Sequence, residues 1–486
     1  MRFYLSKYFL LALLISSVFN GVSQNALGEE IFEQKSNFTP VIKDAAVKQT
    51  DQPEIIDTVK KITDVNYSAP SVLYKTNYET SQIVPAKMVN EPLSKLYQSV
   101  LKVGFGNYNM PFVDAFLNST RNKDLYWGVR YSHLSSYAKY AGLGRTDFGD
   151  DKAGIYAKKF YKKHTLSADA NYSRNMVHFY GFNDTLKNDN GTAYKQYFQL
   201  FEGKLRLQSH YGDTTNKINH DIHLNYYNYG DHYSTYENNV FASGLFNARI
   251  NKESFNVLAS VDYYNVHSTH DTVNNIIAKV NPYFMAGGKK WKADIGIAGV
   301  LDNFNTTGTT TGTTATGTKY YFYPRLNIFY DVYQSIIIPY AGLDGGLTKN
   351  SYRSLSSTNP FVLSNLPYKN TDNKYNVYGG LRGALSSNLS YDVKVLYGRY
   401  NNMAYFLADY NASADNSFAN RYKVIYMNTN YLNVNAQVKY QLKEKVTFIA
   451  KGNYYGYSIK DTSNVKPWHK PNFDLTFSAH YSLKSK

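Results

Sequence analysis

The sequence predicts an all-β protein, a transmembrane antiparallel up-and-down β-barrel of about eighteen strands, within a range of about 14 to 20. Three observations favour this fold class. Runs of alternating apolar and polar residues recur from Leu96 to the end of the chain. The connections between these runs are alternately short and long, and the N-terminus has the residue order of an export signal.

The N-terminal residues 1–24 are predicted to be a signal peptide. Arg2 and Lys7 flank the start of an apolar run of about a dozen residues, and small residues around Gly21 follow it. A buried N-terminal helix is the alternative. After this segment no run approaches ~18 consecutive apolar residues, so no transmembrane helix is expected in the mature chain.

Residues 25–94 differ from the rest of the chain. They are polar, contain five prolines and show little alternation, which predicts a periplasmic extended linker. Residues 95–486 are then the outer-membrane β-barrel. The linker is also the segment through which a periplasmic or outer-membrane protein partner is expected to bind.

The stretch WKADIGIAGVLDNF, from Trp291, shows the two faces expected of each strand. Its apolar face is predicted to meet lipid, through Trp291, Ile295, Ile297 and Leu301. The polar face is predicted to line the lumen of the barrel. The lumen-facing candidates are Arg130, Lys204, Arg206, Lys292, Asp294, Arg382, Asp392 and Lys394. Because acids and bases share this face, the net charge of +16 does not predict anion selectivity.

Connection lengths give the strongest indication of topology. Short turns recur on one rim, for example Tyr161–Lys163 and Gly287–Lys290. The connections between them are long, and include Ser135–Lys152, Gly230–Asn239, Thr348–Asn373 and the low-complexity loop Asn305–Thr318. One short rim and one long rim are typical of outer-membrane barrels. A soluble two-sheet sandwich is the alternative, since alternation alone does not identify lipid.

The sequence predicts no catalytic residue, metal site or cofactor. Cysteine is absent, which excludes disulfides, thiolate metal sites and cysteine nucleophiles. No helix-turn-helix or zinc spacing supports nucleic-acid binding. A serine beside a histidine, as at His133, Ser135 and Ser136, is what outer-membrane barrel enzymes use. In a serine-rich chain this pairing is expected by chance, so a lipid-modifying enzyme ranks third and a non-enzymatic protein is predicted.

Several segments carry a resemblance to a known family. They are EPLSKLYQSVLKVGFGNYNMPFVDAFLNS from Glu91, KDLYWGVRYSHLSS, KKFYKKHTLSADANYSRNMVHFYGF and KPWHKPNFDLTFSAHYSL. Over about residues 55–486 the chain resembles Bacteroidota outer-membrane β-barrels that are similar to TonB-dependent receptors. True receptors of that kind carry a plug domain behind a TonB box. Residues 25–94 are too few for such a plug and contain no recognisable box, so a barrel without a plug domain is expected.

Two functions follow as hypotheses. The first is passive passage or binding of small polar solutes across the outer membrane of a Gram-negative, Bacteroidota-like bacterium. The second is a non-conducting scaffold or accessory subunit of a larger outer-membrane assembly. In both cases the expected partners are outer-membrane lipid and lipopolysaccharide, together with the barrel-assembly machinery during biogenesis, and no nucleic acid.

Overall fold

The computed structural model describes residues 96–482, except 121, 139, 141–144, 180–194, 211–217, 251–252, 309–313, 410–420, 443–444 and 461–465. The predicted signal peptide and the predicted linker, residues 25–94, lie outside the described residues and stay predictions.

The described part of the chain is almost entirely β-sheet, and each strand pairs antiparallel with the next one in sequence. This order confirms the predicted all-β, up-and-down fold of eighteen strands. Among the described residues, no helix is long and apolar enough to cross a membrane. The elements are β1 Ser99–Gly106, β2 Met110–Asn118, β3 Leu125–Ser136, β4 Phe148–Phe160, β5 His164–His178, β6 Lys195–Ser209, β7 Ile218–Asp231, β8 Tyr236–Ile250, β9 Glu253–His267, β10 Asp271–Gly287, β11 Trp291–Gly308, β12 Thr314–Tyr330, β13 Ile338–Thr348, α2 Tyr352–Thr358, β14 Thr371–Ser386, β15 Leu389–Ala408, β16 Tyr422–Leu442, β17 Val446–Ile459 and β18 Phe473–Tyr481.

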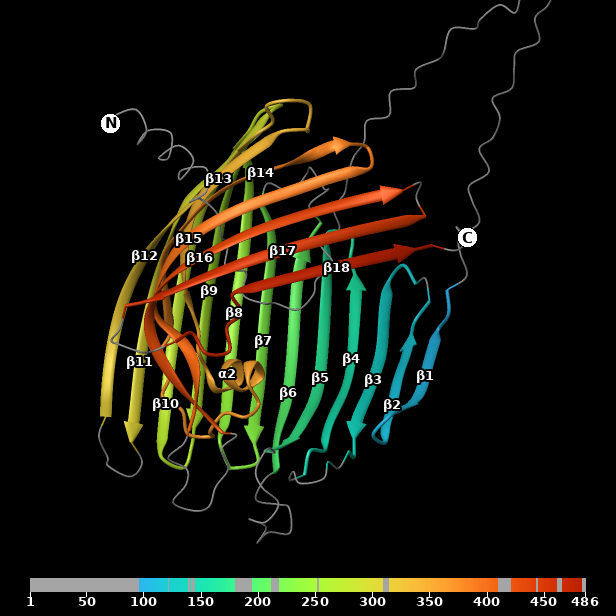
Figure 1. Cartoon of the computed structure of the whole chain (residues 1–486), viewed down its shortest axis with the longest axis vertical. Coiled ribbons are helices and arrows are strands. Elements are labelled where there is room, and N and C mark those ends of the chain that lie inside the picture. Colours follow the sequence, from blue (N-terminus) through green and yellow to red (C-terminus); the bar gives the residue numbers. More distant parts are fainter. Residues whose placement is uncertain are drawn as a thin grey trace, which may run out of the picture. The chain divides into compact units, whose positions relative to one another are not determined.

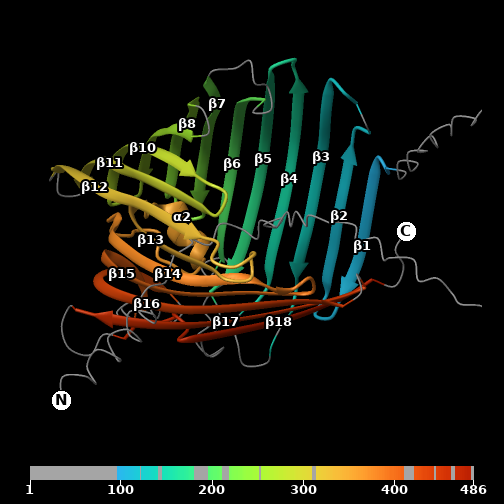
Figure 2. The same cartoon turned by 90° about the horizontal axis from the view of Figure 1, so that it is seen from above.

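The sheet curves strongly, and α2 lies on its concave side (Figures 1 and 2). The ladder runs from β1 to β18, and no pairing joins β1 to β18 within the described residues. Residues of both strands are exposed at almost every position. In the described part of the chain, β1 and β18 are therefore the two edges of the sheet.

The register assigns each residue to one of two faces, because directly opposed residues of an antiparallel pair project to the same side. Glu202 opposes Asn171 on one side and Tyr227 on the other, and Asp262 opposes Ile277. We call the face that carries Glu202 and Asp262 the inner face, because the connection between β13 and β14 contacts both carboxylates.

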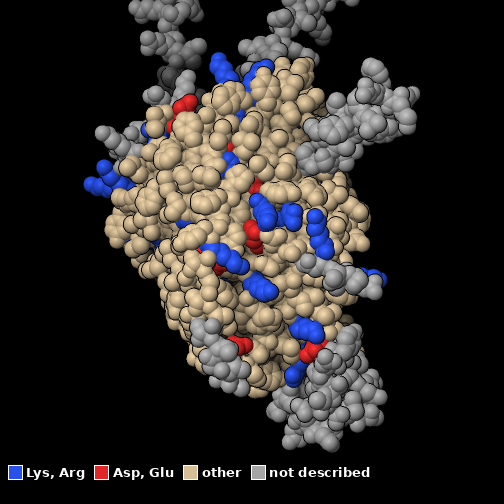
Figure 3. All heavy atoms as spheres, turned by 90° about the vertical axis from the view of Figure 1, so that its left-hand side faces the viewer, with Lys and Arg blue, Asp and Glu red and all other residues tan. Residues whose placement is uncertain are grey.

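The opposite face, here the outer face, carries large exposed apolar side chains. Phe201 and Leu205 lie on the outer face of β6 and are 57% and 49% exposed. Exposed apolar residues occur on nearly every strand, and Figure 3 shows a side of the molecule where uncharged residues form most of the surface and lysines and arginines lie in small groups. A continuous apolar outer surface is what a barrel wall presents to lipid.

Two predicted loops are shorter in the structure than expected. Much of the predicted loop Asn305–Thr318 is strand, because β11 continues to Gly308 and β12 begins at Thr314. Threonine is β-branched and fits a pleated strand, so the low-complexity run continues the ladder. The predicted long connection Gly230–Asn239 is reduced to residues 232–235, where the Asp231 carboxylate accepts hydrogen bonds from the backbone N–H groups of a tight turn.

The two faces make a testable contrast within β11. Ile295 is 57% exposed on the outer face. Replacing it with arginine should destabilise the protein folded in bilayers by about 2–4 kcal/mol near mid-membrane. Lys292→Ala, on the inner face, should cost much less. The measurement is reversible unfolding in lipid vesicles, and equal costs for the two variants would contradict the assignment of the faces.

Candidate functional site

The most distinctive feature of the inner face is the connection between β13 and β14, residues 349–370, which we call the inserted segment. Its two ends are tied together at the wall: Asn350 Nδ2 donates to the carbonyl oxygen of Lys369 at 2.8 Å and to Thr371 Oγ1 at 2.8 Å. The segment therefore leaves the sheet and returns to it at almost the same point. The sequence predicted only a long connection here.

A short helix, α2, forms in the first half of the inserted segment. Ser351 caps it, because its hydroxyl group accepts from the backbone N–H of Ser354 while Ser354 Oγ accepts from the backbone N–H of Ser351. This reciprocal arrangement satisfies the free N–H groups of the first turn. Tyr352 and Leu355 are then buried against the wall, at 0% and 4% exposure.

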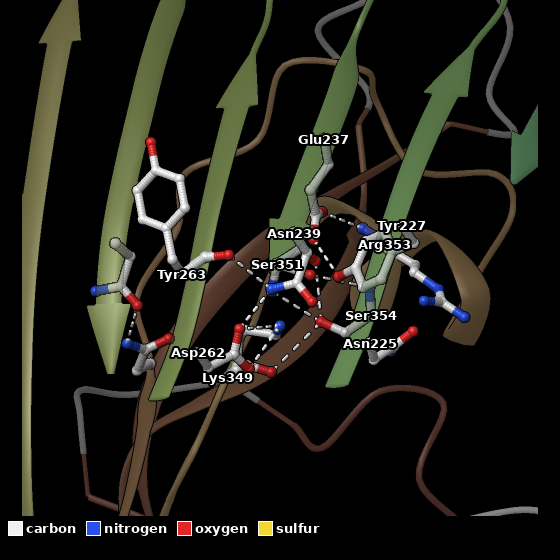
Figure 4. Close-up of polar contacts among 12 residues, drawn as sticks. Asn225, Tyr227, Glu237, Asn239, Asp262, Tyr263, Lys349, Ser351, Arg353 and Ser354 are labelled. Atoms are coloured by element: carbon white, nitrogen blue, oxygen red, sulfur yellow. Dashed lines mark hydrogen bonds and ion pairs between the residues drawn. The ribbon is translucent and has the colours of Figure 1, made fainter. Parts of the chain in front are cut away.

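Charged groups join the inserted segment to strands β6, β8 and β9, and Figure 4 shows the contacts with Glu237 of β8 and Asp262 of β9. Arg353 Nη1 lies 3.1 Å from Glu202 Oε1, and its guanidinium group lies over the Tyr227 ring. Lys349 Nζ lies 2.8 Å from Asp262 Oδ2. In both ion pairs the cation belongs to the inserted segment and the carboxylate to the sheet. The two pairs therefore hold the segment against the sheet in one orientation.

Two further carboxylates on the wall are hydrogen-bonded to the segment. Glu237 is fully buried and accepts from the Tyr227 hydroxyl group at 2.5 Å and from the backbone N–H of Arg353 at 2.8 Å. Asp231 accepts from the hydroxyl groups of Tyr352 and Ser364. A buried carboxylate is tolerated when such donors replace its water.

The other end of the inserted segment contacts the far part of the sheet. Val362 forms a parallel bridge with Tyr422, and the backbone N–H of Leu363 donates to the Tyr422 carbonyl oxygen at 2.9 Å. One apolar cluster connects the segment to both parts of the wall. Its buried members are Phe198, Tyr227, Tyr229, Tyr264, Val266, Val273, Tyr352, Leu355, Val362, Leu366, Tyr368, Phe406 and Val424. The segment thus spans the concave side from β6–β9 to β15 and β16.

A cavity of about 300 Å³ lies beside the inserted segment. Lys470, in the connection between β17 and β18, contributes an ammonium group whose pKa is lowered by burial. Aromatic rings and an amide complete a lining suited to a small polar solute. The lining residues are Thr358, Asn359, Phe361, Phe406, Tyr422, His469 and Lys470.

The register places all eight predicted lumen residues on the inner face, but it does not gather them into one site. On β3 and β6, Arg130 donates to Asn171 at 2.6 Å, and Arg206 Nη2 lies 2.6 Å from Asp221 Oδ2. On the strands across the concave side, cations lie over aromatic rings. These are Lys292 over Phe329, Arg382 over Phe329 and Tyr340, and Lys394 over Tyr378. The remaining members are Lys204, which pairs with Glu202, Asp392, which accepts from Tyr340, and Asp294, which shares the face of Lys292 in β11.

The four predicted lipid-facing residues lie on the outer face of β11. Trp291, Ile295 and Ile297 are 42%, 57% and 51% exposed, and Leu301 is half-buried. No group of three or more histidines, aspartates or glutamates among the described residues is arranged to hold a metal ion. The sequence did not identify Lys349, Arg353, Glu237 or Asp231, because their partners are distant in the chain.

Comparison with solved structures identifies the type of barrel. The chain is similar to the alcaligin outer membrane receptor FauA from Bordetella pertussis, with a TM-score of 0.56 and 10% identity over 81% of this chain and 67% of that one. For the siderophore receptor PiuA from Acinetobacter baumannii, the TM-score is 0.58 at 9% identity, over 79% and 69% of the two chains. For the copper transporter OprC it is 0.54 at 12% identity, over 79% and 64%. The fold is that of outer-membrane receptor barrels.

These similarities concern the fold. No protein-family model matches the chain, and no curated protein matches its sequence. The chain spans about two thirds of the length of the receptors it resembles. FauA and PiuA are receptors and OprC is a transporter. The Bacteroidota assignment stays a prediction.

Replacing Glu237 with alanine tests the anchoring of the inserted segment. The change leaves the Tyr227 hydroxyl group and the Arg353 N–H without their acceptor, which should lower the free energy of unfolding by about 1–3 kcal/mol for each donor. Unfolding in urea and amide hydrogen exchange over residues 351–364 measure the effect. Glu237→Gln keeps an acceptor oxygen and should cost less, whereas equal losses would contradict the hydrogen-bond account.

Proposed function

We propose that this chain is an outer-membrane barrel that gives passive passage to small polar solutes, with the inserted segment narrowing the route. The observation that carries the proposal is the contrast between the two parts of the inner face. The inserted segment is anchored to β6–β9 and β16, whereas charged residues continue along the inner face of β3, β11, β14 and β15. Where no segment among the described residues crosses it, a charged face is suited to water and polar solutes.

The membrane placement is part of the same proposal. The fold of outer-membrane receptor barrels and the exposed apolar residues of the outer face support contact with outer-membrane lipid and lipopolysaccharide, and insertion by the barrel-assembly machinery. Solute passage here needs no energised partner, and selection would come from the width left beside the inserted segment. Binding of a protein partner through residues 25–94 belongs to the alternative function, a non-conducting scaffold.

The ends of the inserted segment allow a clean test of conduction. Because Asn350 Nδ2 and the Lys369 carbonyl oxygen are 2.8 Å apart, a short Gly-Ser linker can replace residues 351–368 without moving the strands. We expect the full chain to conduct in planar bilayers and the linker variant to conduct several-fold more. Ile295→Ala, which changes the outer face and leaves the inner face as it is, is the matched control and should leave the conductance near that of the full chain.

If the chain is instead a non-conducting scaffold, no conductance is expected in planar bilayers. Absence of single-channel conductance in the full chain, in the linker variant and in a variant lacking residues 25–94 would overturn the pore proposal. Stoichiometric co-purification of a partner after mild detergent extraction would then favour the scaffold.

A further inference from the structure

Three polar side chains at the facing ends of β3 and β4 form a hydrogen-bonded chain. His133 Nε2 lies 3.0 Å from Ser135 Oγ, and His133 Nδ1 lies 2.6 Å from Asp151 Oδ1. Because a carboxylate only accepts, we assign the proton of the neutral imidazole to Nδ1, and Nε2 then accepts from the Ser135 hydroxyl group. His133 and Ser135 are two positions apart and share a face, and Asp151 lies directly opposite His133 in the ladder. The register therefore places His133 and Asp151 side by side on the outer face. Ser135 is the next outer-facing residue of β3.

This order of groups is that of an activated nucleophile. A histidine that accepts the serine proton through Nε2, and is oriented by a carboxylate at Nδ1, can act as general base for attack by the serine oxygen. Ser135 is 4% exposed, so water competes little for its hydroxyl group. Ser136 offers a contrast within the same strand, because its hydroxyl group donates to the Tyr108 carbonyl oxygen instead.

The chain of hydrogen bonds lies on the outer face, just beyond a row of aromatic side chains. Tyr131, two positions before His133, is 43% exposed, and the register continues from it through Ala153 to Tyr172 and Phe201. The rings of Tyr172 and Phe201 are 4.8 Å apart. Aromatic rows mark the boundary between hydrocarbon and water on membrane barrels. Taken as that boundary, the row puts Ser135 near the depth where ester groups of membrane lipids are found.

An apolar groove of about 680 Å³ lies on the same face, on the hydrocarbon side of the aromatic row. Its floor is made of small residues, Ala157, Ala168, Ala170 and Gly203, and Trp127 and Leu205 stand at its sides. His133 lies four positions after Val129 of the groove, a distance of about 13 Å along β3. Ala153 lies between Tyr131 and Tyr172, so the aromatic row is interrupted by a small side chain between the groove and Asp151.

A cation, Arg174, lies in the same row of the outer face as His133 and Asp151. Arg174 opposes Asp151 in the ladder, and its guanidinium group lies over the Tyr197 ring. Its Nε is buried and has no hydrogen-bond partner in the part of the chain that the structure describes. Arg174 as a whole is half-buried, and its guanidinium group can donate to a phosphate group of a bound lipid.

We propose that this site hydrolyses the long-chain acyl ester of a phosphorylated membrane lipid. Ser135 Oγ attacks the ester carbonyl carbon while His133 Nε2 takes the hydroxyl proton. The tetrahedral intermediate collapses, the C–O bond to the alcohol breaks, and His133 returns the proton to the leaving alcohol. Water, deprotonated by His133, then releases the fatty acid from the acyl-serine and restores the Ser135 hydroxyl group. Asp151 is a positioning residue, and the acyl chain occupies the groove.

The proposal rests on the membrane placement and not on solute passage, so conductance results do not bear on it. Its first test is labelling of the full chain, refolded into vesicles, with a long-chain alkyl fluorophosphonate. The full chain should be labelled at Ser135. Ser135→Ala should abolish labelling, and His133→Ala should slow it by about 100-fold or more. Ser136→Ala is the matched control and should label normally. No labelling of the correctly folded full chain would overturn the proposal.

Vesicles of phosphatidylglycerol and vesicles containing lipid A distinguish two sources of the same ester chemistry. Release of fatty acid from either lipid, lost in Ser135→Ala, supports the proposal and names the source. Asp151→Asn should lower kcat with little change in KM and alter its pH profile, which a merely structural role would not do. Release from neither lipid would overturn the assignment of a lipid substrate.

Gly203→Leu tests the groove separately from the nucleophile. A Cβ built at Gly203 meets nothing within 4 Å, so a side chain can leave the backbone there and enter the groove. It should lower kcat/KM for a hexadecanoyl ester by about 10-fold or more and leave that for a butanoyl ester nearly unchanged. Equal losses for both esters would reject the groove as the acyl site.

Discussion

The continuous antiparallel register from β1 to β18 is the constraint on which the rest of the structure depends. In hydrocarbon every backbone N–H and C=O must find a partner, and the ladder supplies one for each pair of neighbouring strands. The same ladder fixes the side of every side chain, since a slip by one residue would exchange the two faces. The inner carboxylates that hold the inserted segment, and the outer row that carries His133 and Asp151, are both consequences of this one register.

The pairing continues but shifts at bulges where the inserted segment joins the sheet. Shifts occur between Asp344 and Gly346 and between Asn373 and Tyr375, on the two strands that flank the segment. Such bulges bend a strand and redirect the chain. Gly345 is required at the first of them, because a Cβ there would lie 2.8 Å from the Tyr323 ring and 2.9 Å from the Asn373 carbonyl oxygen. The two bulges thus bend β13 and β14 locally. The inserted segment between these strands turns toward the concave side of the sheet and does not extend past the strand ends.

The strands and most turns could be predicted from the sequence because they depend on local order. Period-two alternation is a property of a few consecutive residues, and it assigned Lys292 and Ile295 to opposite faces of β11. The threonine run after Asn305 misled the prediction, because its composition suggests a flexible loop while its β-branched side chains fit a strand.

The functional contacts depend on separations that no local pattern reveals. Lys349 meets Asp262 across 87 positions, and Arg353 meets Glu202 across 151. A helix of seven residues has too little length to show an amphipathic period, so neither α2 nor its inward fold could be inferred. The pair His133 and Ser135 was visible in the sequence. The carboxylate that makes it chemically distinctive, Asp151, is brought opposite His133 by the register alone.

Strand β6 contributes to two separate sites, the anchor of the inserted segment on its inner face and the apolar groove on its outer face. Glu202 and Lys204 point to the inner face, where Glu202 holds Arg353 of the inserted segment. Gly203, between them, forms part of the outer groove. Side chains on opposite faces of a strand share no contacts, and the energies of residues without shared partners are additive. A change in the groove should therefore leave the inserted segment in place, and a change in the anchoring carboxylates should leave the groove intact. The alternation that first identified the barrel is also what allows an aqueous inner face and a lipid-facing site to evolve separately on the same strands.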